Sequence, residues 1–185
     1  MKINSYAKIN LGLHVLDKRV DGFHNITTIF QEIDFYDQLT IEKSKTMIFD
    51  TNVNWIDATN NTCISAIEIL KQYHPDLPNF KIFLQKNIPT NAGLGGGSSN
   101  GTAILKGINQ LCSLNIQEKE MKKLAEKISA DSTFFVGGGM QGAEEKGQKL
   151  YPIKNIQLDN YILLVMPDIK AVSYTHLTLP TIYSV

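Results

Sequence analysis

The chain carries, at residues 91–100, the sequence Asn-Ala-Gly-Leu-Gly-Gly-Gly-Ser-Ser-Asn. Four of the five residues from Gly93 to Gly97 are glycine, so the backbone can adopt positive φ angles and approach a ligand closely. The stretch lies between an alternating segment typical of a strand and an apolar pattern typical of a helix. Successive N–H groups of such a loop, with the positive end of the following helix, favour a phosphate group. The stretch therefore predicts a phosphate-binding loop.

Two better-known phosphate loops do not fit this stretch. A Walker A loop requires a lysine followed by serine or threonine, and residues 91–100 contain no lysine. A dinucleotide-binding loop requires a third glycine three positions after Gly97, where this chain has Asn100. A flexible surface linker is the plain alternative, but a linker is rarely placed between a strand and a strongly patterned helix.

Periodicity extends the prediction outward from the loop. In residues 3–16, apolar and polar side chains alternate as in a strand, and Asn60 or Asn61 is suited to cap a helix over 61–73. Further helices are predicted at 100–112 and 117–128, and further strands at 26–33, 38–42, 80–84, 134–136, 140–143 and 161–166. The two strands before residue 43 are expected to join around Phe35-Tyr36-Asp37. The pattern predicts one α/β unit, of the two-layer α+β kind.

Composition excludes several classes of protein. The 185 residues include 18 Lys plus Arg and 18 Asp plus Glu, whereas a protein that holds nucleic acid through phosphates alone is normally basic. No apolar run is long enough to span a bilayer. The cysteines, Cys63 and Cys112, lie far apart, and the four histidines lack metal-ligand spacing. We expect a cytoplasmic protein that uses no dedicated metal ligands and binds neither nucleic acid nor membrane.

Four segments together resemble the GHMP kinases, the family of galactose, homoserine, mevalonate and phosphomevalonate kinases. Residues 89–100 resemble the central motif of that family, although Asn91 stands where glycine is usual. Residues 7–11 (Ala-Lys-Ile-Asn-Leu), 21–24 (Asp-Gly-Phe-His) and 130–135 (Ala-Asp-Ser-Thr-Phe-Phe) resemble segments of the branch that acts on cytidine diphosphate-linked methylerythritol. The resemblance implies an N-terminal domain similar to the second domain of ribosomal protein S5.

The resemblance also implies a reaction. ATP, with Mg²⁺, would donate its γ-phosphoryl group to the 2-hydroxyl of the small-molecule substrate, on the non-mevalonate route to isoprenoids. Asp131 would accept the proton of that hydroxyl, Lys8 would neutralise charge, and Asn10, Phe23 and His24 would bind the substrate. The residues implied for ATP are Pro89, Ala92, Gly93, Leu94, Gly95, Gly96, Gly97, Ser98 and Ser99. A bulky side chain at Gly96 is expected to fill the space of a phosphate.

The same residues also allow plainer interpretations. A lysine on the polar face of a strand, such as Lys8, is usually only solvated. Asp131 could cap the next element, and Phe23 could pack in the core. At the level of the whole protein, the alternatives are another GHMP kinase with a different alcohol substrate, or a non-catalytic nucleotide- or RNA-binding module with the S5-like fold.

Domain boundaries follow from where the resemblance stops. It covers residues 1–171, which we expect to form the N-terminal, ATP-binding domain and the start of a C-terminal domain. Residues 172–185 instead resemble a translated sequencing adapter, so we expect a non-native tail there. A family member is roughly half as long again, and this chain alone is therefore expected to be inactive as a kinase.

Overall fold

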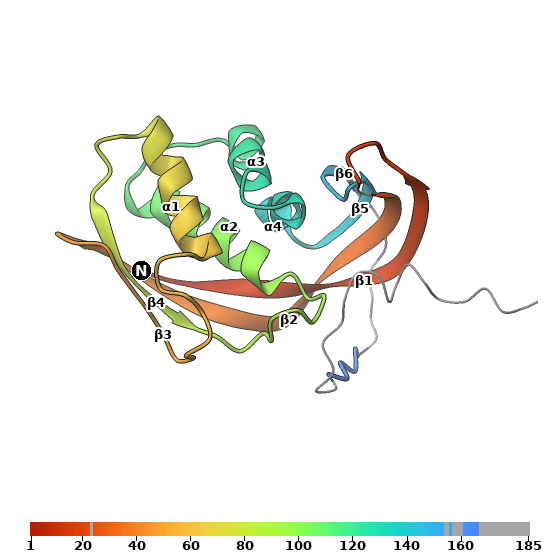
Figure 1. Cartoon of the computed structure of the whole chain (residues 1–185), viewed down its shortest axis with the longest axis horizontal. Coiled ribbons are helices and arrows are strands. Elements are labelled where there is room, and N and C mark those ends of the chain that lie inside the picture. The colour runs from red at the N-terminus through yellow and green to blue at the C-terminus, as the bar shows by residue number, and fades with distance from the viewer. Residues whose placement is uncertain (23, 154–155, 157–160, 167–185) are drawn as a thin grey trace, which may run out of the picture.

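In the computed structural model, a long strand, β2 (His24–Ser44), lies at the centre of the sheet and pairs with three other strands (Figure 1). The structure describes residues 1–22, 24–153, 156 and 161–166. Strand β1 (Lys2–Lys18) pairs antiparallel with β2 along one edge. The other edge of β2 is shared: residues 38–44 pair with β4 (Asn79–Gln85), and residues 26–31 pair with β5 (Met140–Glu145). Strand β3 (Ile48–Thr51) runs parallel to β4, so the sheet is mixed.

The remaining elements are one short strand and a layer of helices. The strand is β6 (Lys149–Pro152), which pairs with β5. The helices are α1 (Thr62–Tyr73), α2 (Gly96–Leu111), α3 (Glu118–Glu126), the 3₁₀ helix η1 (Ala130–Thr133) and α4 (Phe134–Gly137). The four α-helices of the described residues lie on the same face of the sheet (Figure 1). The predicted two-layer α+β architecture is confirmed.

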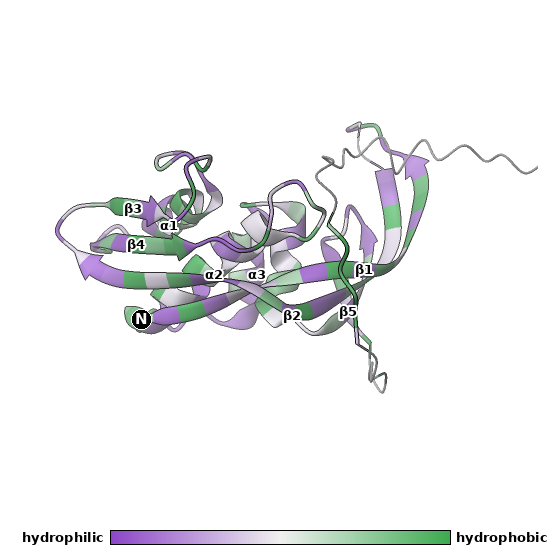
Figure 2. Ribbon diagram, turned by 90° about the horizontal axis from the view of Figure 1, so that it is seen from below, coloured by the Kyte–Doolittle hydropathy of each residue, from purple (hydrophilic) through white to green (hydrophobic). Residues whose placement is uncertain are grey.

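The main core lies between α2 and the sheet. Ile104 and Ile108 of α2 are fully buried, in one cluster with Leu39 and Ile41 of β2. Close approach of the helix requires Gly107, because a Cβ atom there would lie 2.5 Å from Cδ1 of Ile41. Alternation of hydrophilic and hydrophobic residues along the strands is visible in Figure 2, and it gives the sheet one face for this core.

Several predicted elements are confirmed, with small differences in length. Strands β1, β4 and β5 and helices α1 and α3 all occupy predicted segments. The side chain of Asn61 caps α1 by accepting hydrogen bonds from the N–H groups of Cys63 (2.9 Å) and Ile64 (3.1 Å). Of the two candidate caps, Asn61 is therefore the one used.

Several details of the predicted secondary structure were wrong. Residues 26–33 and 38–42 belong to one continuous strand, because Asp37 is buried inside it rather than placed in a turn. Helix α2 begins at Gly96, four residues early, because Gly95 adopts the left-handed conformation that starts it. Residues 134–136 form part of α4, and β3 and β6 were not predicted at all. Residues 161–166 form no strand.

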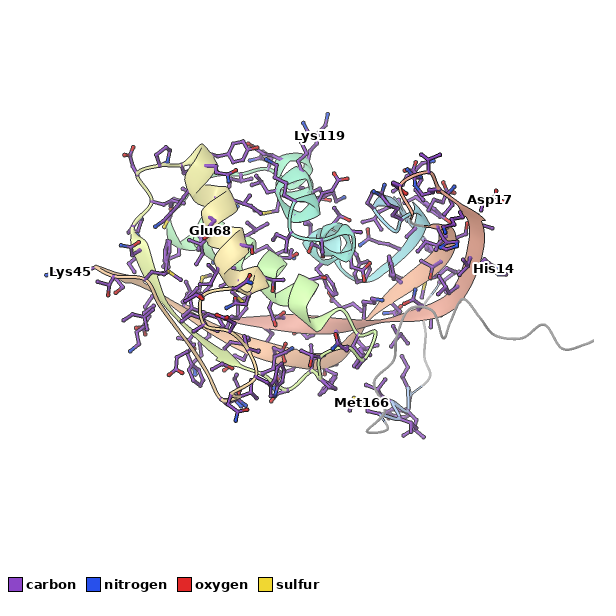
Figure 3. All side chains as sticks on the ribbon, in the orientation of Figure 1. His14, Asp17, Lys45, Glu68, Lys119 and Met166 are labelled. Carbon is purple, nitrogen blue, oxygen red and sulfur yellow. The ribbon has the colours of Figure 1, made fainter. Side chains whose placement is uncertain are left out.

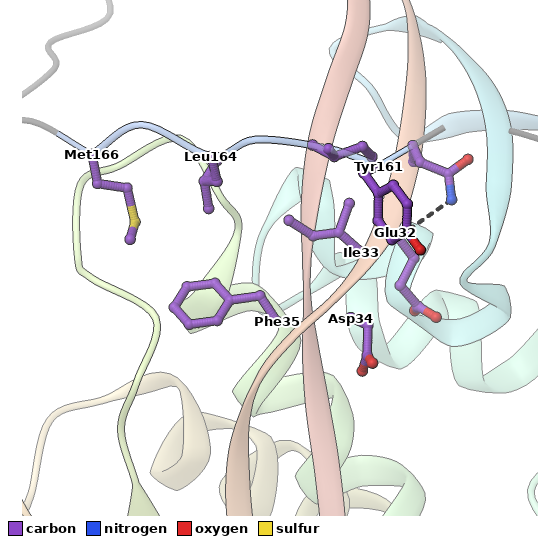
Figure 4. Close-up of a pocket in the computed structure, with 9 residues that line it drawn as sticks. Glu32, Ile33, Asp34, Phe35, Tyr161, Leu164 and Met166 are labelled. Atoms are coloured by element: carbon purple, nitrogen blue, oxygen red, sulfur yellow. Dashed lines mark hydrogen bonds between the residues drawn. The ribbon is translucent and has the colours of Figure 1, made fainter. Parts of the chain in front are cut away.

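Residues 161–166 lie against the side of the sheet opposite the helices. Figure 3 shows Met166 on that side, whereas Glu68 of α1 and Lys119 of α3 lie in the helix layer. Together with β2, this segment encloses a pocket of about 530 Å³ whose wall includes Ile33, Phe35 and Leu164 (Figure 4). The predicted tail, residues 172–185, lies outside the described residues. No helix within the described ranges is long and apolar enough to cross a membrane.

Candidate active site

The glycine loop connects β4 to α2 and has the backbone conformation expected of an anion-binding loop. Asn91, Gly93 and Gly95 have φ angles of 59°, 72° and 69°, and the left-handed conformation of Asn91 agrees with its tolerance for that region. Gly95 is the N-cap of α2, and no side chain caps the helix. The first N–H groups of an uncapped helix have no intrahelical acceptor, so they are available to a phosphate.

Two of the glycines are required by packing beneath the loop. A Cβ atom at Gly95 would lie 2.8 Å from Cζ of Phe135 and 3.2 Å from Cγ of Lys8. A Cβ atom at Gly96 would lie 2.9 Å from both Nζ of Lys86 and Cγ2 of Ile88. The expectation that a side chain at Gly96 would fill the phosphate space is therefore wrong, since its Cβ would point into the protein.

Lys8 joins the loop to the other candidate catalytic groups. Its backbone N–H donates to the carbonyl of Leu94 at 2.9 Å. Its ammonium group, which is buried, donates to Oδ1 of Asn10 at 2.9 Å and lies 3.6 Å from Oδ2 of Asp131. The same ammonium lies 5.0 Å from the centre of the Phe30 ring, within cation–π range. Lys8 is thus a partly desolvated, oriented cation and not a solvated surface lysine.

Asp131 reaches this site from η1. Its side chain is 36% exposed, so a substrate hydroxyl can approach it. Contacts of η1 and of its N-cap, Ser129, with α2 hold it in place: the Ser129 hydroxyl donates to Oγ of Ser98 at 2.7 Å, and the Thr102 hydroxyl donates to the carbonyl of Ser132 at 3.0 Å. Asp131 therefore faces the site instead of capping a helix.

Asn10 is oriented by a short chain of hydrogen bonds. Its Nδ2 donates to the Thr28 hydroxyl at 2.8 Å, and that hydroxyl donates to the carbonyl of Gly12 at 2.5 Å. With the amide nitrogen held in this way, Oδ1 of Asn10 faces Lys8. Thr28 was missed by the sequence analysis, although a threonine between Ile26 and Phe30 on the buried face of a strand is the signal of a polar contact.

The remaining predicted site residues lie either in the glycine loop or far from Lys8 and Asp131. His24 begins β2, opposite Lys18 and six positions before Phe30, which is roughly 20 Å of extended strand. Phe23 lies outside the described residues. Ala92 is exposed in the loop, Leu94 is buried beneath it, and the Ser99 hydroxyl is buried and accepts a hydrogen bond from Ser5 at 2.7 Å.

A second pair of charges lies behind the site. Glu32 is the register partner of Lys8 in β2. Burial raises the pKa of the Glu32 carboxyl, while the positive charge of Lys106 opposes that shift. Burial likewise lowers the pKa of Lys106, whose ammonium donates to the carbonyl of Phe135 at 2.7 Å. Because Lys106 is held by a backbone carbonyl, we assign this pair no catalytic role.

Comparison with known proteins identifies the type of domain. Residues 61–140 match the family model described as the GHMP kinases N terminal domain. The chain carries a GHMP kinase N-terminal domain. Within that domain, the matched residues contain the glycine loop and Asp131, while Lys8 and Asn10 precede them.

Curated relatives of this GHMP kinase domain are named 4-diphosphocytidyl-2-C-methyl-D-erythritol kinase. The protein of Persephonella marina is 36% identical over 183 residues, which is 98% of this chain and 64% of that protein. The protein of Caldicellulosiruptor bescii is 39% identical over 172 residues, which is 91% of this chain and 60% of that protein. The chain thus spans less than two thirds of the length of these relatives.

Solved structures share the fold of this chain. A crystal structure of 4-(cytidine 5'-diphospho)-2C-methyl-D-erythritol kinase superposes with a TM-score of 0.72 and 29% identity, over 83% of this chain and 55% of that one. The mevalonate kinase of Methanococcus jannaschii superposes with a TM-score of 0.64 and 19% identity, over 84% of this chain and 56% of that one. The second similarity shows a shared fold only.

Proposed function

We propose that this chain is the ATP-binding part of a kinase that phosphorylates the 2-hydroxyl of 4-diphosphocytidyl-2-C-methyl-D-erythritol. The observation that carries the proposal is the contact of Lys8 with Asp131, 3.6 Å apart, directly beside an uncapped glycine loop. Phosphoryl transfer depends on positioning and on charge stabilisation more than on covalent chemistry. The thiols of Cys63 and Cys112 are free, as is usual in a reducing compartment, and this supports a cytoplasmic location for the proposed enzyme.

Each side chain has a task that its surroundings suit. Asp131, partly exposed, accepts the proton of the attacking hydroxyl. Lys8, buried and fixed by Asn10 and by the backbone of Leu94, places its positive charge between that carboxylate and the transferred group. The N–H groups at the start of α2 hold the phosphates of ATP. Asn10 hydrogen-bonds the substrate, Phe23 stacks on its cytosine ring, and His24 hydrogen-bonds the edge of that ring.

Magnesium would be held at this site mainly by the phosphates of the bound nucleotide. Within the part of the chain that the structure describes, no group of three or more His, Cys, Asp or Glu could hold a metal ion. Mg²⁺ is commonly held by one or two carboxylates together with substrate phosphates, and Asp131 and the Ser98 hydroxyl are the side chains on hand. When bound, the ion would neutralise charge on the phosphates.

The test of the catalytic roles is Asp131→Asn in the full-length protein. An amide cannot accept the proton, so kcat should fall by about 10²–10⁴-fold while the affinity for ATP stays within threefold. Asp34→Asn is the matched control, because Asp34 is an exposed carboxylate elsewhere on β2. Turnover of Asp131→Asn at the parent rate would refute the assigned mechanism.

Substrate identity needs its own assay. The full-length protein should phosphorylate the cytidine-linked substrate at least 100-fold more efficiently than mevalonate, galactose or homoserine, since a base-binding site discriminates by both stacking and hydrogen bonds. A preference for one of the other alcohols would assign the chain to a different GHMP kinase. Tight binding of RNA that weakens steeply with salt would instead support the non-catalytic alternative.

A further inference from the structure

Asp37 is a fully buried carboxylate within β2, and both of its oxygens accept hydrogen bonds. Its Oδ1 accepts hydrogen bonds from the backbone N–H groups of Asn87 at 2.7 Å and Ile88 at 2.8 Å. Its Oδ2 accepts from Nδ2 of Asn100 at 2.8 Å and also forms an ion pair with Lys86. A charge taken out of water is tolerated only with such complete pairing.

These donors come from the two ends of the glycine loop. Asn87 and Ile88 are the residues that lead into it from β4, and Asn100 lies in the second turn of α2, which follows it. Inside the loop, Leu94 is buried and accepts the N–H of Lys8, whereas Asn91, Ala92 and Gly93 are exposed and a Cβ atom at Gly93 would touch nothing within 4 Å. The position of the loop therefore depends strongly on its two ends, and one carboxylate holds both.

Lys86 lies directly beneath the loop. Its ammonium group is buried, and it lies 2.9 Å from the position of a Cβ atom at Gly96. Burial lowers the pKa of Lys86, and the hydrogen bond and the negative charge of Asp37 oppose that shift. The first turn of α2 thus packs directly on the ammonium of Lys86, which is paired with Asp37.

The same network continues to the strand that carries Lys8. Nδ2 of Asn100 also donates to Oγ of Ser5 at 2.9 Å, and the Ser5 hydroxyl donates to Oγ of Ser99 at 2.7 Å. Ser5 and Lys8 both belong to β1, three residues apart. Asp37 is thereby connected to the loop entrance, to the loop exit and to the strand of the proposed catalytic lysine.

We infer that Asp37 is a positioning residue, which holds both ends of the glycine loop in the conformation that binds the phosphates of ATP. The inference rests on the proposed function, because it takes ATP as the ligand of the loop. Asp37 itself does not contact the nucleotide. It acts through the N–H groups of Asn87 and Ile88 and through the side chains of Lys86 and Asn100.

The direct test is Asp37→Asn in the full-length protein. The new amide has nearly the same volume, but one of its two polar atoms becomes a donor that must face two existing donors. We expect the Kd and the KM for ATP to rise by at least about 10-fold, while the KM for the alcohol substrate changes by less than twofold. Asp34→Asn, in the same strand but exposed, should change neither constant.

Two further variants separate positioning from mere stability. Asp37→Asn alone leaves the buried ammonium of Lys86 without its ion-pair partner. Combining it with Lys86→Met removes that unpaired charge and should recover part of the lost ATP affinity. Asn100→Ser removes only one of the four donors, so it should fold even where Asp37→Asn does not, and it should weaken ATP binding several-fold. All Kd values are measured at temperatures where circular dichroism shows a folded protein.

The outcomes are distinct. If the parent protein binds ATP and the folded Asp37→Asn and Asn100→Ser variants bind it equally well, the inference is overturned and the proposed function stands. If these variants lose thermal stability alone, Asp37 is a structural residue and the inference is likewise overturned. A parent protein with no affinity for ATP overturns both. Selective loss of ATP affinity, with partial recovery in the double variant, supports the inference.

Discussion

Gly95 offers the sharpest test of how the loop is built. Replacement by alanine places a Cβ atom on a backbone with φ of 69° and ψ of 16°, which costs roughly 1–2 kcal/mol for a residue other than glycine. The Cβ would also lie 2.8 Å from the Phe135 ring, which is buried against Phe134. Overpacking of this kind costs about 1–3 kcal/mol, and the reduced entropy of the unfolded chain returns under about 1 kcal/mol. The expected loss of stability for Gly95→Ala is about 2–4 kcal/mol.

Gly97→Ala is the matched comparison, since Gly97 lies two residues later, in the first turn of α2. Its backbone φ is not positive, and its nearest neighbour, Thr62, would lie 3.9 Å from the new Cβ. Alanine should therefore stabilise α2, by up to about 1 kcal/mol. Urea denaturation followed by circular dichroism measures both variants. A Gly95→Ala variant as stable as the parent, or as stable as Gly97→Ala, would show that the packing of Phe135 and Lys8 beneath the loop is not as described.

Two other predictions concern buried ionisable groups. Burial raises the pKa of Glu32, so the folded state disfavours its charged form. Glu32→Gln should raise the melting temperature at pH 8, and the gain should vanish below the ordinary carboxyl pKa, where both states are protonated; a gain that is equal at pH 4 and pH 8 would contradict this. Burial also raises the pKa of Cys63 to about 12, so only about one thiol in 10,000 is ionised at pH 8. Iodoacetamide should therefore label the half-buried Cys112 first, as mass spectrometry of Cys112→Ser and Cys63→Ser variants can show; equal rates would refute the burial of Cys63.

The sequence was most informative where one local rule acts alone. Alternation predicts β1 and β4, and Asn61 is a sufficient signal for the start of α1 because a cap needs only its own next turn. The glycine loop was found from composition because few other uses require so many glycines together. Lys8 and Asp131 were paired only through a resemblance, and their 3.6 Å contact depends on residues 123 positions apart.

The errors occurred where distant partners override local preference. Asp37 resembles a turn residue, yet donors 49 to 63 positions away in sequence hold it inside a strand. Gly96 to Ser99 have weak helix propensity, yet packing on Lys86 and Ile88 makes them the first turn of α2. Phe134-Phe135-Val136 is too short to show a period, so only its tertiary position identifies it as helix. None of these partners can be identified from local sequence.

Strand β1 explains how a single residue can serve both the loop and the chemistry. Among the described strands β1 pairs only with β2, so its outer edge presents backbone N–H groups without a strand partner. At Lys8 that N–H donates to the carbonyl of Leu94, while the side chain of the same residue reaches Asn10 and Asp131. One residue therefore holds both the loop, through its backbone hydrogen bond to Leu94, and the cation, whose position is set by the side-chain contacts with Asn10 and Asp131. Ser5 and Asn100 link the same strand to Asp37, so a shift of β1 would move the proposed catalytic cation and the loop together. Such coupling preserves their relative position, which is the quantity on which phosphoryl transfer depends.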